Sequence, residues 1–309
     1  MLANARATAA PLLEIFATGM RELDWIAGRD YVIDDLYAEG HVERLPALAD
    51  ELARHKVDLI VSAGTVPTAA AKRATSAIPI VFYFVGDPVG AGFVASLARP
   101  GGNLTGLGGL GPEMIAKQLG IMKQSVPSTA RMAVLWYPDF PPHQVGLDNA
   151  QAAARSIGIA LKPIALHSAD DIDAAFATLA REPVDALLML GHPCLFTQGA
   201  RVAKLAAALR LPTMGPFREI VREGVLMSYG WEIVDDVRRV PHFVDRILRG
   251  GAKPADLPIE QPTRFHLVIN LTTAKAIGVT IPQSVLLSAE DVIERTYAAS
   301  GLNGDVVIV

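Results

Sequence analysis

The stretch VDLIVSAG at residues 57–64 returns later in the chain as VDALLMLG at residues 184–191. Both stretches open with Val-Asp and close with Gly, and most of the residues between are apolar. A short apolar run bounded by a turn residue is typical of a strand buried on both faces of a parallel sheet. The repetition indicates that the same strand, with the elements around it, is encoded twice.

The segments around the two stretches follow the same order. Alanine-rich segments with helical periodicity alternate with short apolar runs, which predicts an α/β protein with mainly parallel sheets. The expected strands are 59–62, 80–84, 132–136, 186–190 and 225–229. The expected helices are 46–55, 67–75, 150–157, 172–180 and 200–209. The chain therefore predicts two doubly wound, Rossmann-like lobes joined by a hinge.

The remainder of the chain is expected to return to each lobe in turn. A predicted helix at 233–249 completes the first lobe, and a strand at 264–271 with a helix at 272–279 completes the second. The predicted N-terminal lobe is 1–109 plus 231–258, the predicted C-terminal lobe is 110–230 plus 259–301, and 302–309 is a tail. The tail has strong β propensity, and we expect it either to fray or to pair with a sheet edge.

The first lobe is expected to lack most of its first strand. The second lobe opens with a clear strand, RMAVLWYP at 131–138, whereas only Met1 and Leu2 precede the small, polar stretch ANARAT. We expect the natural chain to begin upstream, with a longer strand and an export signal. The alternative is a lobe that folds with one strand fewer.

Composition sets limits on the function. The 309 residues suffice for two domains, and 51% of them are hydrophobic. A net charge of −4 and a pI of about 6.0 argue against a nucleic-acid partner, whose binding domains usually have a pI above about 9. The single cysteine, Cys194, excludes an intrachain disulfide and a thiolate metal cluster. We expect neither a metal nor a cofactor.

One glycine-rich motif is set aside. GLGGLG at 106–111 matches G-x-G-x-x-G, but a dinucleotide site also needs a long preceding strand and an acid about 20 residues later. No acidic residue lies between Glu113 and Asp139. We interpret these glycines as the first crossing between the lobes.

The candidate ligand-binding residues follow the predicted strands. In parallel α/β sheets ligands bind beyond the carboxyl ends of the strands, and two lobes that face each other can enclose a small molecule by hinge closure. The candidates are Gly64, Thr65, Gly86 and Asp87 in the first lobe, and Trp136, Tyr137, His192, Phe217 and Tyr229 in the second.

Each candidate has a chemical role and a structural alternative. Gly64 lets backbone approach a ligand, and Thr65 is expected to cap helix 67–75, whose first N–H groups suit a carboxylate. Asp87 could pair with an ammonium group, and the aromatic residues could form a stacking wall. Alternatively, Thr65 only caps its helix, Asp87 only starts a turn, Trp136 is core packing and His192 is a turn residue.

Longer stretches carry a resemblance to a known family. These are ELDWIAGRDYVID (22–34), residues 40–107, in which 79–107 is the most distinctive part, GVLMSYG (224–230) and residues 251–286. They resemble the ABC-transporter substrate-binding proteins, a family with tryptophan- and tyrosine-binding members. The resemblance implies a type I periplasmic-binding-protein fold and capture of an aromatic amino acid or related carboxylate between the lobes. It also implies delivery to an ABC permease, a monomer, and a periplasmic or membrane-anchored extracytoplasmic location.

Two departures from that family affect the expected ligand. Tyr137 stands where relatives usually have Asn, and His192-Pro193 stands where they usually have Asp-Pro. Both changes remove groups that could hold an ammonium, so another carboxylate-bearing or aromatic compound would fit as well.

Two other functions are open to such a chain. One is a ligand-sensing module of the same fold without a transport role. The other is an enzyme, for which Asp87 with His192 is the one pair that could supply acid–base chemistry. We expect no enzymatic activity.

Overall fold

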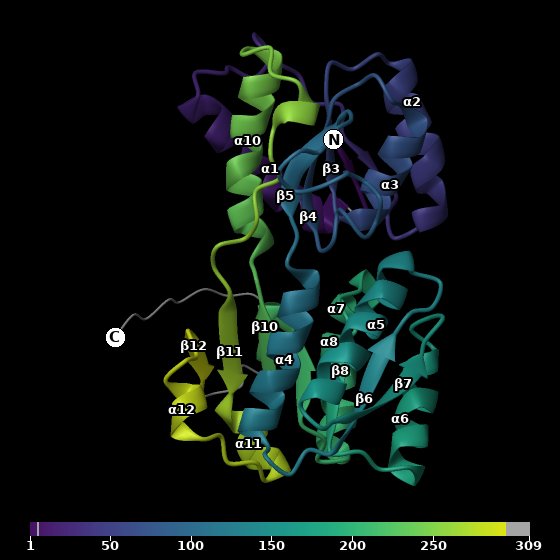
Figure 1. Cartoon of the computed structure of the whole chain (residues 1–309), viewed down its shortest axis with the longest axis vertical. Helices are drawn as coiled ribbons and strands as arrows, with labels where there is room; N and C mark the ends of the chain where they lie inside the picture. Colours follow the sequence, from purple (N-terminus) through teal and green to yellow (C-terminus); the bar gives the residue numbers. More distant parts are fainter. Residues whose placement is uncertain (5, 295–309) are drawn as a thin grey trace. The chain divides into compact units, whose positions relative to one another are not determined.

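The computed structural model describes residues 1–4 and 6–294, which form two compact α/β units (Figure 1). Unit 1 comprises Met1–Met114 and Trp231–Phe265, and unit 2 comprises Ile115–Gly230 with the chain from His266 onward. The predicted fold class, two α/β lobes with mainly parallel sheets, is confirmed. The predicted tail at 302–309 lies outside the described residues.

The unit boundaries fall later in the chain than the predicted ones at 109/110 and 258/259. Residues 259–265 stay with unit 1 because the Glu260 N–H donates to the Gly106 carbonyl at 3.0 Å and the Glu260 carboxylate accepts two bonds from Arg239, both 2.9 Å long. The expectation that GLGGLG forms a crossing is wrong for Gly106 and Gly108, which lie inside a strand. A Cβ on Gly106 would approach the Phe82 carbonyl oxygen to 1.9 Å, so glycine is needed for the pairing.

Unit 1 is built on a five-stranded sheet in the order β2-β1-β3-β4-β5. All of its strand pairs are parallel. The strands are β1 (Leu2–Ala3), β2 (Leu36–Tyr37), β3 (Ile60–Ala63), β4 (Ile80–Val85) and β5 (Leu104–Gly108). The two-residue β1 lies between β2 and β3, the place of the first strand that the sequence suggested to be short.

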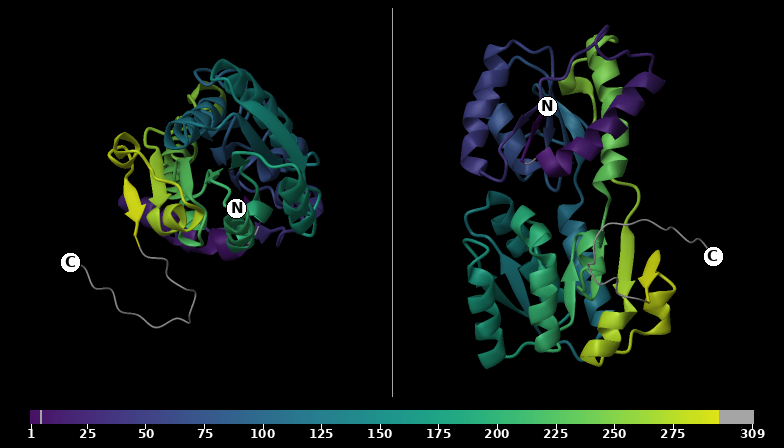
Figure 2. Two further views of the ribbon diagram at one scale, coloured as in Figure 1. Left: turned by 90° about the horizontal axis from the view of Figure 1, so that it is seen from below. Right: turned by 180° about the vertical axis from the view of Figure 1, so that it is seen from behind.

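Helices cover both faces of this sheet. On one face, Ile60, Ile80 and Phe82 pack with residues of α2 (Leu45–Arg54) and α3 (Thr65–Ala74). On the other, Val61, Val81 and Tyr83 pack with α1 (Arg6–Glu22) and α10 (Ile233–Leu248). Figure 2 shows α1 lying beside α10. Short 3-10 helices occupy Val42–Arg44 and Pro254–Asp256.

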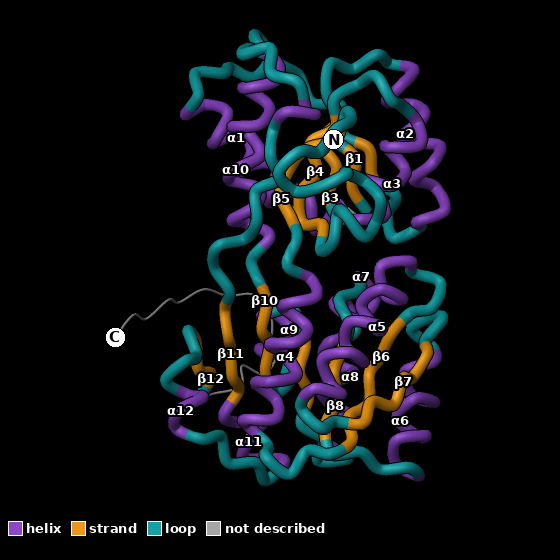
Figure 3. The backbone as a smooth tube through the Cα atoms, in the orientation of Figure 1, coloured by secondary structure: helices purple, strands orange, loops and turns teal. Residues whose placement is uncertain are grey.

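Unit 2 has a seven-stranded sheet in the order β12-β11-β10-β9-β8-β6-β7 (Figure 3). Its pairs are parallel except β10 with β11. The strands are β6 (Arg131–Trp136), β7 (Ala160–Ala165), β8 (Ala186–Met189), β9 (Thr213–Gly215), β10 (Met227–Gly230), β11 (His266–Asn270) and β12 (Asp291–Ile293). The helices are α4 (Gly111–Ser125), α5 (Pro141–Ser156), α6 (Asp171–Arg181), α7 (Pro193–Thr197), α8 (Gly199–Ala208), α9 (Arg218–Arg222), α11 (Leu271–Ile277) and α12 (Gln283–Leu286).

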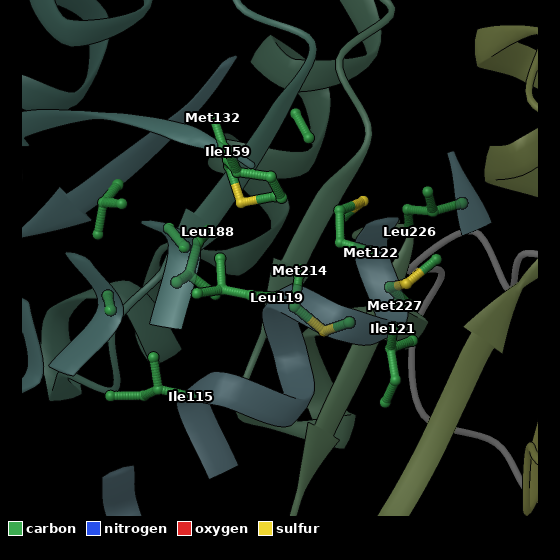
Figure 4. Packing of buried hydrophobic residues seen from close by; sticks show 14 of the residues in the cluster. Ile115, Leu119, Ile121, Met122, Met132, Ile159, Leu188, Met214, Leu226 and Met227 are labelled. Atoms are coloured by element: carbon green, nitrogen blue, oxygen red, sulfur yellow. The ribbon is translucent and has the colours of Figure 1, made fainter. Parts of the chain in front are cut away.

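The core of unit 2 also has two sides. Met132 and Leu188 pack with Leu119 and Met122 of α4 in one cluster (Figure 4). The opposite sheet face packs against α6 and α8, for example through Phe176. The central strands such as β6 and β8 are therefore buried on both faces, as the apolar runs predicted, whereas the edge strand β7 is partly exposed.

The repeated Val-Asp has a clear structural role in unit 2. The Asp185 carboxylate accepts hydrogen bonds from the N–H groups of Ala130 (2.8 Å) and Arg131 (2.7 Å) at the start of β6. Although partial burial opposes it, these bonds hold the pKa of Asp185 below its ordinary value. The matching Asp58 of unit 1 is exposed.

Within the described residues, no helix is long and apolar enough to span a bilayer.

Two glycines in helix interiors provide a test of the packing. A Cβ on Gly19 of α1 would lie 2.7 Å from the Pro241 side chain of α10, whereas a Cβ on Gly120 of α4 would meet nothing within 4 Å. We expect Gly19→Ala to lower the free energy of unfolding by about 1 kcal/mol or more because α1 and α10 must move apart. Gly120→Ala should raise it by ~0.5–1 kcal/mol because alanine favours the helix. Urea unfolding measures both, and equal effects would contradict this packing.

Candidate functional site

The loop after β3 brings together a glycine and a helix start. Gly64 has φ +83°, a conformation that favours glycine, and its N–H donates to the Tyr83 carbonyl of β4 at 2.8 Å. Gly64 is also the N-cap residue of α3. The sequence prediction that Thr65 caps this helix is wrong, since Thr65 is the first helical residue and no side chain caps the helix. Thr65 is half-buried at the carboxyl end of β3 and stays a candidate on position alone.

The polar side chain that supports this loop is Thr68. Its hydroxyl donates to the Gly64 carbonyl at 2.7 Å and lies 2.8 Å from the Ser62 hydroxyl. The apolar strand pattern did not single out Thr68. These bonds hold the first turn of α3, in which Thr65 and Val66 carry an N–H group and Pro67 carries none, at the end of the strand.

Asp87 takes part in a turn. Its carboxylate accepts from the Gly90 N–H at 2.7 Å, and its carbonyl accepts from the Ala91 N–H at 2.9 Å. A Cβ on Gly90 would lie 2.1 Å from the second carboxylate oxygen, so a larger residue there would displace the Asp87 side chain. The preceding Gly86 uses its carbonyl to accept from the Gly111 N–H at 3.0 Å. The structural alternative for Asp87 is thus observed, and an ammonium partner is not required to explain the residue.

A second group of residues, which the sequence pattern did not select, lies at the end of β4. Phe84 has φ +57°, an unusual backbone conformation for a bulky residue. Its N–H donates to the Asp236 carboxylate at 3.0 Å, and the Trp231 indole N–H donates to the same oxygen at 3.2 Å. Trp231 also lies against the Phe84 ring, with ring centroids 5.4 Å apart. One carboxylate of α10 therefore fixes both a strand end and an aromatic side chain.

Asp236 is buried, with 3% of its surface exposed. Burial raises the pKa of Asp236 to about 7, against the two hydrogen bonds that lower it, and the nearby charges of Asp235 and Glu260 raise it further. Near neutral pH this group therefore exchanges a proton while it holds Phe84 and Trp231.

In unit 2 the residues after β6 and β8 form an aromatic pair. The rings of Tyr137 and His192 stack, with centroids 3.8 Å apart and an interplanar angle of 12°. The Tyr137 hydroxyl donates to the Cys194 sulfur at 2.9 Å. His192 caps α7, because its Nδ1 accepts from the Cys194 N–H at 3.2 Å. The proton of the neutral imidazole must then be on Nε2.

His143, which the sequence pattern did not select, joins these two loops. Its Nδ1 accepts from the Tyr137 N–H at 2.8 Å, and its Nε2 lies 3.0 Å from the Gly191 carbonyl, to which it donates. Burial lowers the pKa of both His143 and His192 to about 4, and their proximity lowers that of His192 further. This wall of unit 2 is therefore aromatic and uncharged at neutral pH.

The remaining candidates in unit 2 are partly buried. Trp136 and Tyr229 pack against the α4 side of the core, which matches the packing alternative for Trp136. Phe217 packs against Phe196 edge-to-face at 5.3 Å. Burial raises the pKa of the Tyr229 hydroxyl, and the Tyr229 carbonyl accepts from the Gln118 side chain at 2.7 Å.

No cluster of three His, Cys, Asp or Glu residues in the described part of the chain could hold a metal ion. Asp87 belongs to unit 1 and His192 to unit 2, and each is engaged in a local turn or cap. The strand ends thus present partly exposed aromatic rings and a helix start without a side-chain cap, while the buried Asp236 carboxylate holds Phe84 and Trp231 from behind.

Comparison with known proteins shows which family and which individual proteins this chain is similar to. A family model described as ABC transporter substrate binding protein matches residues 13–293. A tyrosine-binding protein of Clostridioides difficile (strain R20291) is 23% identical over 262 residues, which are 85% of this chain and 75% of that protein.

Solved structures share the fold. A conserved domain protein from Vibrio cholerae superposes with a TM-score of 0.87 at 25% identity, over 94% of this chain and 97% of that one. An ABC domain in complex with L-Trp from Streptococcus pneumonia has a TM-score of 0.84 at 24% identity, over 94% and 98% of the two chains.

Asp236 makes a pH-dependent contribution to stability that can be measured. Its folded pKa of about 7 lies above the ~3.9 of an unfolded aspartate, so the folded state holds the extra proton between these values. Its contribution to stability is full below pH ~4, falls as the pH rises, and is constant above about pH 7. Asp236→Asn keeps a hydrogen-bond acceptor and lacks the titration. We expect the variant to gain on the wild type by up to ~1.4 kcal/mol per pH unit between pH 5 and 7.

Urea unfolding of both proteins from pH 5 to pH 8.5 checks this expectation. Parallel stability curves for the wild type and Asp236→Asn would show that the carboxylate does not titrate in this range.

Proposed function

This chain belongs to the ABC transporter substrate-binding protein family, and on that premise we propose that it captures an aromatic amino acid or a related aromatic carboxylate. Proteins of this family bind a small molecule outside the cytoplasm and work with an ABC permease. The observation that carries the choice of ligand class is the partly exposed aromatic rings at the strand ends, Phe84 with Trp231 in unit 1 and His192, which stacks on the buried Tyr137 ring, in unit 2.

The chemistry of these surfaces supports a planar ligand with an acidic group. Aromatic rings pair favourably with other rings in offset or edge-to-face geometry, at about 0.5–1.5 kcal/mol beyond the area buried. The first N–H groups of α3 carry no side-chain cap and suit a carboxylate. Burial lowers the pKa of His192 to about 4, so its imidazole is neutral at pH 7. It has no negative charge that could pair with the ammonium group of an amino acid. A deaminated aromatic acid is therefore as good a fit as an amino acid.

Two relatives point to the same ligand class. The Clostridioides difficile relative is named a tyrosine-binding protein, and the Streptococcus structure holds L-Trp. The similarity of this chain to these two proteins supports the proposal of an aromatic ligand.

The finer features of the family belong to the same proposal. We infer enclosure of the ligand by hinge closure, a monomer in solution, and a periplasmic or membrane-anchored location. A ligand-sensing role without transport would use the same surfaces, and a neighbouring permease and ATPase gene pair would favour import. The family is one of solute-binding proteins, which are typically not enzymes, and the engaged states of Asp87 and His192 give no specific support to catalysis.

A thermal-shift screen tests the proposal. The compounds are L-tryptophan, L-tyrosine, their deaminated propionic acid analogues, and L-leucine as an aliphatic control. A ligand present at 100 times its Kd adds about 2.7 kcal/mol to the free energy of unfolding. We expect at least one aromatic compound to raise the melting temperature.

Variants locate the binding surface. Thr65→Ala and His192→Ala should remove the shift, while Arg238→Ala on the exposed face of α10 should retain it. No shift with any compound would refute the proposed function. Identical behaviour of the three variants would show that the surface is misplaced.

A further inference from the structure

Three aromatic residues of unit 1, Phe84, Trp231 and Phe265, form what we term the Phe84 cluster. Ring centroids are 5.4 Å apart for Phe84 and Trp231, and 6.2 Å apart for Trp231 and Phe265. Trp231 and Phe265 are the first and last residues of the second chain segment of unit 1. All three residues keep part of their surface exposed. The cluster thus offers aromatic surface at the carboxyl end of β4.

The backbone of Phe84 is held in a costly conformation. A bulky residue at φ +57° lies in a sparsely populated, strained region of backbone conformations, and such positions concentrate at binding and active sites. The register between β4 and β5 also shifts between Phe82 and Val85, so the strand is irregular at this point. The irregularity turns the end of β4 out of a regular ladder and determines where the Phe84 ring lies.

Asp236 maintains this arrangement from the first turn of α10. The same carboxylate oxygen accepts from the Phe84 N–H and from the Trp231 indole N–H. Since both bonds end on one buried atom, the positions of Phe84 and Trp231 are coupled. An aliphatic side chain at 236 would release both.

A second tryptophan that donates a hydrogen bond to α10 shows what a purely structural pair looks like. Trp25 donates its indole N–H to Asp245 of α10 at 2.9 Å, and the Arg249 guanidinium lies over its ring at 4.5 Å. Trp25 is only 8% exposed and packs in the core between α1 and α10. Trp231 makes the same kind of bond to the same helix but keeps its ring partly exposed at a strand end. If the contact between Phe84 and Trp231 served only to stabilise the fold, we would expect both rings to be buried, as the Trp25 ring is.

We propose that the Phe84 cluster binds the planar ring of the aromatic ligand, and that Asp236 is the positioning residue that holds Phe84 and Trp231 in place for it. This inference rests on the proposed function and names the part of unit 1 that recognises the ligand. A flat ring can lie against the exposed faces of Trp231 and Phe84 without disturbing the bonds to Asp236. The ligand class is therefore an indole or phenyl compound.

Isothermal titration with L-tryptophan and L-tyrosine tests the cluster. Trp231→Leu, which removes the ring, should weaken binding by about tenfold. Asp236→Leu should weaken it similarly because the cluster is released, while Asp236→Asn, which keeps an acceptor, should stay within about threefold. The matched control Trp25→Phe, which loses the equivalent bond to Asp245, should bind as the wild type does.

A second test, by fluorine NMR, uses the wild-type protein, so its result does not depend on whether Trp231→Leu or Asp236→Leu folds. The wild type labelled with 5-fluorotryptophan carries three fluorine probes, at Trp25, Trp136 and Trp231, assigned with single Trp→Phe variants. Added L-tyrosine should shift the Trp231 resonance through its ring current and leave the buried Trp25 resonance in place.

The outcomes separate this inference from the proposed function. If no compound of the screen binds the wild type, the proposed function fails. If the wild type binds only L-leucine, the proposed function fails as well. If the wild type binds an aromatic compound equally well after Trp231→Leu, or shows an unmoved Trp231 resonance, the inference is overturned and the proposed function stands. Equal losses in Trp231→Leu and Trp25→Phe also overturn it, because they indicate general destabilisation.

Discussion

Burial of parallel strands on both faces is the constraint on which both units depend. In unit 1 the strands lie between α2 and α3 on one side and α1 and α10 on the other, and unit 2 is covered in the same way by α4 and α6 with α8. A strand covered on both faces has no side chain left for chemistry along its length. Polar and aromatic groups can meet a ligand only where the strand ends, which confines the site to a few residues after β3, β4, β6, β8 and β10.

The two units use these strand ends differently. Unit 2 presents a neutral surface, because burial keeps His143 and His192 deprotonated and their ring nitrogens bind neighbouring backbone. Unit 1 presents an uncapped helix start, a strained Phe84 and a carboxylate that titrates near neutral pH. A repeated architecture has thus acquired two distinct surfaces, and the difference lies in side chains that follow the strands.

Much of the fold was predictable because burial leaves a local signature. The strand expected at 59–62 is observed at Ile60–Ala63, and the helix expected at 172–180 at Asp171–Arg181. The helix expected at 150–157 begins earlier, at Pro141, since proline is compatible with a first helical turn.

The site was less predictable because its contacts are not local. We selected Gly64, Asp87, Tyr137 and His192 because each follows a strand. That criterion does not show that the Asp87 carboxylate accepts a hydrogen bond within its own turn, or that the Tyr137 ring stacks on His192. The bond between Asp236 and Phe84 joins residues 152 positions apart, and an acid in the first turn of α10 reads as an ordinary favourable charge at a helix start. A positive φ at Phe84 has no sequence signal, since the pattern there is a regular apolar strand.

Hydrogen exchange of backbone amides with and without L-tryptophan tests the central claim most directly. The account predicts that added ligand slows exchange in the loops after the strands of both units, at residues 64–68, 84–91, 136–140 and 191–194. The loops at the opposite ends of the strands, such as 55–58 and 182–185, should exchange at unchanged rates. Slowed exchange confined to those opposite loops, or a uniform change over the chain, would contradict it.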